Sequence, residues 1–171
     1  MIIFLAGETG SGKTDTGWAL IGALGAVLLD CDWFASRSPF SWDRGADVES
    51  VYQAILNQVA FHLGQGRTDF VVTLTPEMAV AFESCRPGFE ECGLPIQAFR
   101  LAAEPHIVQQ RIRARDRDQK SVELANAARH RALLDELFGD NSVFAMIDNA
   151  GMDPRTTADA IIRRAKNENS K

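Results

Sequence analysis

The chain has 171 residues, with 46% hydrophobic and 24% charged residues and a formal net charge of −5. This composition is typical of a globular protein and excludes the disordered and fibrous classes, while the negative charge argues against a nucleic-acid partner, which requires a basic surface. No apolar run approaches the roughly 20 residues that span a bilayer, and the N-terminus lacks the basic segment of a signal peptide, so we expect a cytoplasmic protein without membrane contact.

Short apolar runs alternate along the chain with longer segments of helical periodicity. The predicted strands are 2–6, 26–30, 69–74, 95–101 and 142–147. The predicted helices are 13–24, 47–63, 76–85, 105–117, 122–138 and 154–166. Strands that are apolar at nearly every position are typical of parallel strands covered on both faces. The pattern therefore predicts one α/β domain over residues 1–171, with a five-stranded parallel sheet between layers of helices.

The segment GETGSGKT, residues 7–14, follows the first predicted strand and opens the first predicted helix. It matches the pattern G-x-x-x-x-G-K-[ST], in which backbone N–H groups surround phosphate oxygens, the lysine reaches the terminal phosphates and the hydroxyl binds Mg²⁺. The alternative is a chance match in a glycine-rich turn, which the strand-loop-helix context disfavours. We expect a nucleoside triphosphate and Mg²⁺ to be held by Gly7, Thr9, Gly10, Ser11, Gly12, Lys13 and Thr14.

Two carboxylates, Asp30 and Asp32, follow the second predicted strand at the edge of the sheet where the glycine-rich loop lies. Alternation along an extended strand predicts that both side chains point to the same face. A carboxylate there accepts the proton of an acceptor hydroxyl or helps to hold Mg²⁺. We assign Asp32 to catalysis and acceptor binding and Asp30 to the metal; the alternative is that Asp30 merely caps a turn.

The next segment, WFASRSPFSWDRG (33–45), interleaves aromatic residues with Arg37 and Arg44. It predicts a flap over an acceptor site, in which aromatic side chains give shape and arginines bind anions. The alternative is that the aromatic residues belong to the core.

An arginine-rich segment, QQRIRARDRDQK (109–120), closes the fourth predicted helix. Arg111 and Arg115 are four residues apart and share one helical face. That face is predicted to reach back over the triphosphate and to neutralise charge during phosphoryl transfer, although charge runs of this kind are commonly solvated surface. After the last strand, Asn149 is predicted to contact the base of the nucleotide.

Together, GETGSGKT, LDCD, FRLAAEPHIVQQRIRAR and IDNAGMDPRTTADAI resemble the small P-loop kinases, a group that includes nucleoside, shikimate and gluconate kinases. Within this group the chain is most similar to the tunicamycin-resistance ATP-binding proteins. The resemblance implies the strand order 2-3-1-4-5, ATP with Mg²⁺, a mobile lid around 115–122 and phosphorylation of a small molecule.

The segment TLTPEM after the third strand departs from the family. It replaces the triple glycine of shikimate kinases and the aspartate-glycine pair of nucleoside monophosphate kinases. Neither shikimate nor a nucleoside monophosphate is therefore inferred as the substrate of this chain. Thr75 is predicted to contact the acceptor instead.

The leading hypothesis is an ATP-dependent kinase that acts on a hydroxyl of a small molecule, as a monomer or homodimer. The alternatives are a protein that binds ATP and sequesters a ligand without transfer, and a slow ATPase. The pair Asp30 and Asp32 favours phosphoryl transfer. Because the chain has no known acceptor motif, the hypothesis of a binding protein is retained.

Overall fold

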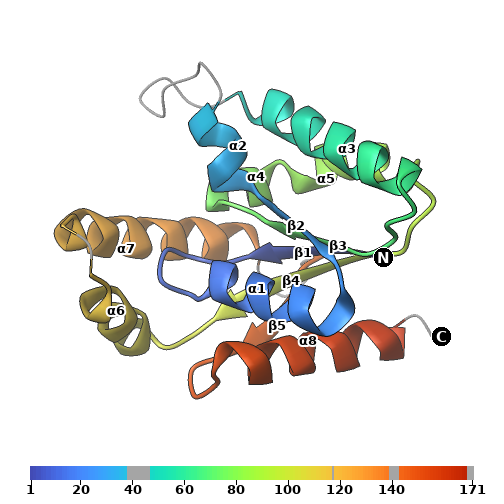
Figure 1. Cartoon of the computed structure of the whole chain (residues 1–171). Coiled ribbons are helices and arrows are strands. Elements are labelled where there is room, and N and C mark those ends of the chain that lie inside the picture. Colours follow the sequence, from blue (N-terminus) through green and yellow to red (C-terminus); the bar gives the residue numbers. More distant parts are fainter. Residues whose placement is uncertain (38–46, 117, 139–142, 169–171) are drawn as a thin grey trace.

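A computed structural model describes residues 1–37, 47–116, 118–138 and 143–168, and its centre is a five-stranded parallel sheet (Figure 1). The strand order is β2-β3-β1-β4-β5, as the resemblance implied. The strands are β1 (Ile2–Ala6), β2 (Val27–Asp30), β3 (Phe70–Thr73), β4 (Ile96–Ala102) and β5 (Ala145–Asp148). In the register, Ile2 lies between Phe70 of β3 and Ile96 of β4. β1 is therefore central, and the loop that follows it emerges in the middle of the carboxyl edge.

Helices cover both faces of the sheet (Figure 1). They are α1 (Lys13–Leu24), α2 (Cys31–Arg37), α3 (Val48–Gly64), α4 (Pro76–Val80), α5 (Phe82–Glu90), α6 (Pro105–Ala114), α7 (Lys120–Leu137) and α8 (Pro154–Glu168). Residues of β1 alternate between two cores because successive side chains point to opposite faces. Phe4 packs with residues of α3 and α5, whereas Ile3 and Leu5 pack with α1 and α8.

Two helices differ from the sequence prediction. The segment after β2, predicted as a flap, begins with helix α2, whose first turn contains Asp32, an acidic residue at the end of a helix that favours negative charge. The predicted helix 76–85 is divided into α4 and α5. At the division, the Ala81 N–H bonds to the Met78 carbonyl, which also accepts a hydrogen bond from the Tyr52 hydroxyl, so the helical pattern is interrupted there.

The carboxyl edge of the sheet carries the elements of the candidate site. The loop 7–12, α2 and α4 follow β1, β2 and β3, and α6 and α7 stand beside them (Figure 1). Among the described helices, none is long and apolar enough to span a bilayer.

Candidate active site

The loop 7–12 has two positions whose backbone conformation glycine alone adopts without strain. Gly10 has φ +85° and Gly12, the residue before α1, has φ +94°. A side chain at Gly10 would also stand 2.8 Å from Ile112 Cγ1 of α6. These positions therefore require glycine both for their conformation and, at Gly10, for close packing against α6.

Lys13, the first residue of α1, folds back over the loop. Its Nζ donates to the Gly7 carbonyl at 2.6 Å and to the Glu8 carbonyl at 3.1 Å. Burial lowers the pKa of Lys13, while the nearby Asp32 and Asp30 carboxylates act in the opposite direction. The ammonium is thus held above the loop, between it and the two carboxylates.

On one side, the loop is supported by α6 and by the segment after β5. Arg111 donates to the Ser11 carbonyl at 3.2 Å and to the Asn149 carbonyl at 2.7 Å. The Asn149 side chain is buried and its Nδ2 donates to the Ser11 carbonyl at 2.8 Å. Asn149 therefore supports the loop through its amide nitrogen, and its contact with the base stays a prediction.

A cavity of about 340 Å³ opens between these elements and the loop. Arg111 and Arg115 line it, and Arg115 also pairs with Glu123 of α7 at 3.4 Å. The other lining residues are Gly10, Gly12, Asp15, Thr16, Ala114, Asn149, Met152, Pro154 and Thr157. Beside the loop, the buried Ser11 Oγ and Asn149 Oδ1 find no partner among the described residues. A glycine cradle with cationic walls and spare polar atoms fits a polyphosphate.

On the other side, α7 holds the loop through a partly buried ion pair that the sequence analysis did not predict. Glu8 is buried, and its carboxylate accepts hydrogen bonds from two nitrogens of Arg131, one of them Nε at 3.0 Å. Arg131 also donates to the Ala103 carbonyl at the end of β4. Burial raises the pKa of Glu8, although Arg131 opposes that shift.

The two predicted carboxylates lie next to the loop but not on one strand face. The Thr14 hydroxyl lies 3.5 Å from Asp30 Oδ2, and Asp30 Oδ1 accepts a hydrogen bond from the Asp32 N–H at 3.0 Å. Because β2 ends at Asp30 and Asp32 belongs to α2, the alternation argument for their common direction was wrong. Partial removal of the Asp32 carboxyl group from water and the nearby Asp30 carboxylate raise the pKa of Asp32, although Lys13 acts in the opposite direction.

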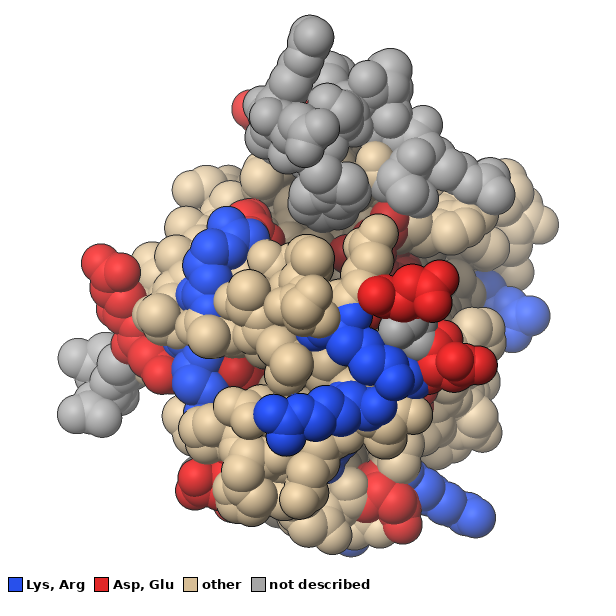
Figure 2. Space-filling view, turned by 90° about the vertical axis from the view of Figure 1, so that its left-hand side faces the viewer, with Lys and Arg blue, Asp and Glu red and all other residues tan. Residues whose placement is uncertain are grey.

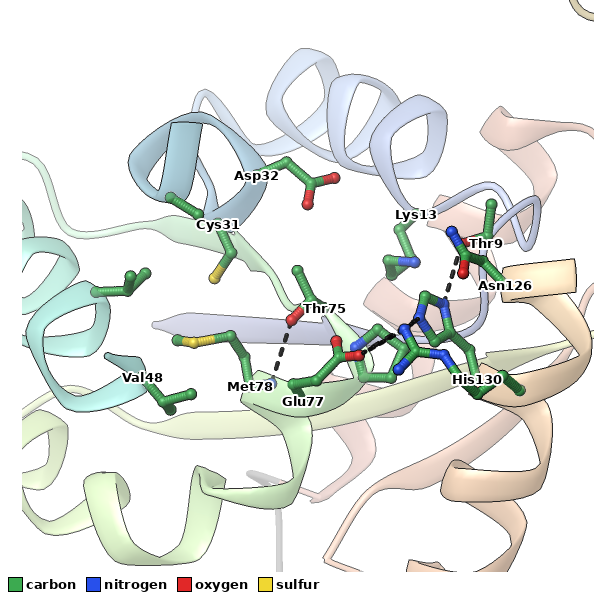
Figure 3. Close-up of a pocket in the computed structure, with 14 residues that line it drawn as sticks. Thr9, Lys13, Cys31, Asp32, Val48, Thr75, Glu77, Met78, Asn126 and His130 are labelled. Carbon is green, nitrogen blue, oxygen red and sulfur yellow. Dashed lines mark hydrogen bonds and ion pairs between the residues drawn. The ribbon is translucent and has the colours of Figure 1, made fainter. Parts of the chain in front are cut away.

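A second cavity, of about 660 Å³, lies on the α4 and α7 side of the loop (Figure 3). Its apolar lining is Cys31, Ala35, Val48, Val51, Pro76 and Met78, and its polar lining is Thr9, Lys13, Asp32, Thr75, Glu77, Asn126, Arg129 and His130. The Asp32 carboxylate and the Lys13 ammonium both project toward the middle of this cavity (Figure 3). Thr75 lines the cavity but also caps α4, since its hydroxyl accepts from the Met78 N–H at 3.2 Å.

The two arginines predicted for the acceptor are not placed in this cavity by the structure. Arg37 is the last residue of α2, and its side chain lies outside what the structure describes. Arg44 lies outside the described residues altogether, as do Phe40 and Trp42 of the predicted flap. The predicted lid, 115–122, joins the end of α6 to the first turn of α7.

Charge on the outer surface is mixed. Figure 2 shows one side of the molecule, where Lys and Arg side chains gather near the middle and Asp and Glu side chains lie around them. Arg111 of α6, which donates to the Ser11 carbonyl, brings positive charge to the loop in a chain of net negative charge.

Glu77 and His130 are cavity residues that the sequence analysis missed. Glu77 lies in the first turn of α4, and its Oε1 is 3.4 Å from His130 Nε2 of α7. Their 53-residue separation in the chain leaves no periodic signal that pairs them, and only the packing of α4 against α7 brings them together. A hydrogen bond from His130 is the main cause of the lowered pKa of Glu77, about 2.

The lowered pKa predicts how stability depends on pH. A carboxyl group whose pKa falls from 4.5 to about 2 on folding stabilises the fold above pH 4.5, and this contribution is lost as the pH falls toward 2. For Glu77→Gln we expect a loss of about 1 kcal/mol near neutral pH, because partial exposure reduces the effect, and a smaller loss in acid. Urea unfolding at a series of pH values measures this difference. The exposed Glu83→Gln of α5 is the control, and a loss for Glu77→Gln that stays constant with pH would contradict the prediction.

The family described as "AAA domain" matches residues 2–138, which include the loop, both carboxylates and α7 up to its end. The chain belongs to the AAA domain family. No curated protein matches its sequence.

Solved structures show the same fold at low sequence identity. A sugar kinase from Janibacter sp. HTCC2649 is 16% identical with a TM-score of 0.66, over 95% of this chain and 92% of that one. A tunicamycin resistance protein from Deinococcus radiodurans is 17% identical with a TM-score of 0.64, over 96% and 95%. A shikimate kinase from Acinetobacter baumannii, in complex with shikimate, is 19% identical with a TM-score of 0.67, over 99% and 95%. The chain therefore has the fold of the small P-loop kinases.

Proposed function

We propose that this protein is an ATP-dependent phosphotransferase that acts on a hydroxyl group of a small molecule. The observation that carries the proposal is the position of Lys13. Its ammonium is held over the phosphate loop and also lines the cavity into which Asp32 projects. A phosphate site and a site for an acceptor therefore meet at one lysine.

On the nucleotide side, the loop N–H groups and the N-terminus of α1 bind phosphate oxygens. Arg111 of α6 and Arg115, the residue after α6, add positive charge. The Thr14 hydroxyl, next to Asp30, holds Mg²⁺. Bound Mg-ATP supplies the transferable phosphoryl group. The fit rests on the glycine cradle and on the unpartnered Ser11 Oγ beside it.

On the acceptor side, Asp32 accepts the proton of the attacking hydroxyl. The raised pKa of Asp32 makes this carboxylate a stronger base than an ordinary aspartate. Thr75, Arg37 and Arg44 remain candidates for acceptor contacts, and the apolar wall that contains Val51 and Met78 packs against the acceptor body. The acceptor is therefore a molecule with an apolar face and a free hydroxyl group.

A second candidate is an ATP-binding protein that sequesters a ligand without transfer. The apolar wall of the acceptor cavity favours this second candidate, because such a wall is suited to bind a ligand whether or not phosphoryl transfer follows. The likeness of the fold to the tunicamycin resistance protein of Deinococcus radiodurans is compatible with either function.

ADP release from Mg-ATP, measured alone and with a panel of nucleosides, sugars, aminoglycosides and tunicamycin-like compounds, separates the two candidates. We expect one class of compounds to raise ADP release and to gain phosphate, detected by mass spectrometry. Tight binding of Mg-ATP and of a panel compound, without phosphate gain by any compound, would favour the sequestering protein.

A further inference from the structure

Helix α7 places His130 between the phosphate loop and the acceptor cavity. The residues on either side of it contact the same site, Arg129 at the cavity and Arg131 at Glu8 of the loop. His130 is only 9% exposed, whereas the side chain of Arg129 is 66% exposed. A buried imidazole at this junction needs an explanation beyond the solvated surface of a helix.

The imidazole is engaged at both nitrogens. Nδ1 lies 3.1 Å from the Thr9 hydroxyl, and Nε2 lies 3.4 Å from Glu77 Oε1 and 3.0 Å from an Arg129 nitrogen (Figure 3). Arg129 also donates to Glu77 at 3.3 Å. A partner at each ring nitrogen fixes the orientation of a histidine ring. Since both nitrogens already have protein partners, the imidazole is suited to hold other groups rather than to transfer a proton.

The group that it holds belongs to the phosphate loop. Thr9 of the phosphate loop and Lys13, the first residue of α1, both line the acceptor cavity. Lys13 is anchored on the carbonyl of Glu8, the residue next to Thr9. A shift of Thr9 therefore also shifts the peptide on which the lysine rests.

We propose that His130 is a positioning residue: supported by Glu77, it fixes Thr9 and with it the acceptor-facing side of the phosphate loop. This inference rests on the proposed function. The other side of the phosphate loop, at Ser11, is held independently by Arg111 and Asn149. Arg131 still holds Glu8 when His130 is lost. We therefore expect the loss of His130 to loosen the loop at Thr9 and to leave its nucleotide half in place.

The test compares His130→Ala and His130→Asn with His106→Ala, a control at an exposed histidine of α6. In the nucleotide-free protein, we expect amide hydrogen exchange at residues 8–10 to be about 10-fold faster in His130→Ala. Turnover of Mg-ATP should fall by about 10- to 100-fold, because small displacements of reacting groups have effects of this size. The Kd for Mg-ADP should change by less than about 2-fold, because the Ser11 side stays supported.

Two further variants distinguish positioning from space filling. In His130→Asn, the amide stands near the position of Nδ1 and should restore much of the slow exchange and the turnover. Thr9→Val should reproduce the effects of His130→Ala, and the double variant should be no worse than either single variant, because both remove one interaction.

Each outcome bears on one proposal. If the native protein does not bind Mg-ATP, the proposed function is wrong, whatever the exchange shows. If the native protein binds Mg-ATP but His130→Ala behaves as His106→Ala, the positioning role is wrong. If His130→Ala does not fold, Thr9→Val decides, since it only replaces a hydroxyl by a methyl group. Native exchange and turnover in Thr9→Val would overturn the inference.

Discussion

Replacement of Lys13 by alanine is expected to abolish turnover of Mg-ATP and to weaken its binding by at least about 100-fold, while the fold remains intact. Lys13 makes its hydrogen bonds to two loop carbonyls and belongs to no hydrophobic core cluster. Its loss therefore removes the positive charge at the terminal phosphates without opening a cavity in the core. Isothermal titration calorimetry with Mg-ATP and the thermal unfolding midpoint measure the two effects.

Lys166→Ala is the matched control, because Lys166 is an exposed lysine of α8, away from both cavities. We expect it to bind and turn over Mg-ATP as the native protein does. Native affinity and turnover in Lys13→Ala would show that the loop is not a triphosphate site, and the proposed function would fall with it.

Replacement of Asp32 by asparagine is expected to lower the rate of phosphoryl transfer by about 10²-fold or more, the usual contribution of a general base. The amide keeps the size of the side chain but does not accept the proton of the acceptor hydroxyl. Because the Thr14 and Asp30 side chains are unchanged, the affinity for Mg-ATP should remain close to native. Single-turnover transfer to the acceptor identified in the panel measures the rate.

Asp32 is also expected to determine how the rate of phosphoryl transfer falls at acid pH. A base must be ionised to act, so transfer falls as the pH drops through the pKa of Asp32, which the protein raises above its ordinary value of 3.8. Asp159→Asn, at an exposed position of α8, is the control. Unchanged transfer in Asp32→Asn would reduce Asp32 to a helix N-terminal residue.

Local sequence determines the strands and the loop for a physical reason. Residues 2–6 are apolar at every position because β1 is covered on both faces, so no alternation is needed to recognise a buried parallel strand. Glycine readily adopts the positive φ angles that Gly10 and Gly12 have. The glycine spacing in GETGSGKT therefore indicates which positions of the loop have this conformation. Strand β1 and the phosphate loop were therefore predictable residue by residue.

Predictions failed where two local patterns met. The acidic LDCD segment was read as one strand end, but the strand stops at Asp30 and α2 begins at Cys31. Alternation and helical periodicity cannot be told apart over so few residues, so the relative direction of Asp30 and Asp32 was not determined by local sequence. Because the segment is so short, the start of α2 at Cys31 was not predicted either.

The sequence by itself determined the fold class, the strand order through the resemblance and the position of the phosphate loop. Only the tertiary structure decided how that loop is held and what faces it. Glu8 meets Arg131, and Thr9 meets His130, across more than 120 residues of chain. Such contacts depend on the packing of α7 beside the carboxyl edge of the sheet. No propensity, period or motif in a single sequence encodes that placement, because it is set by the balance of many contacts at once.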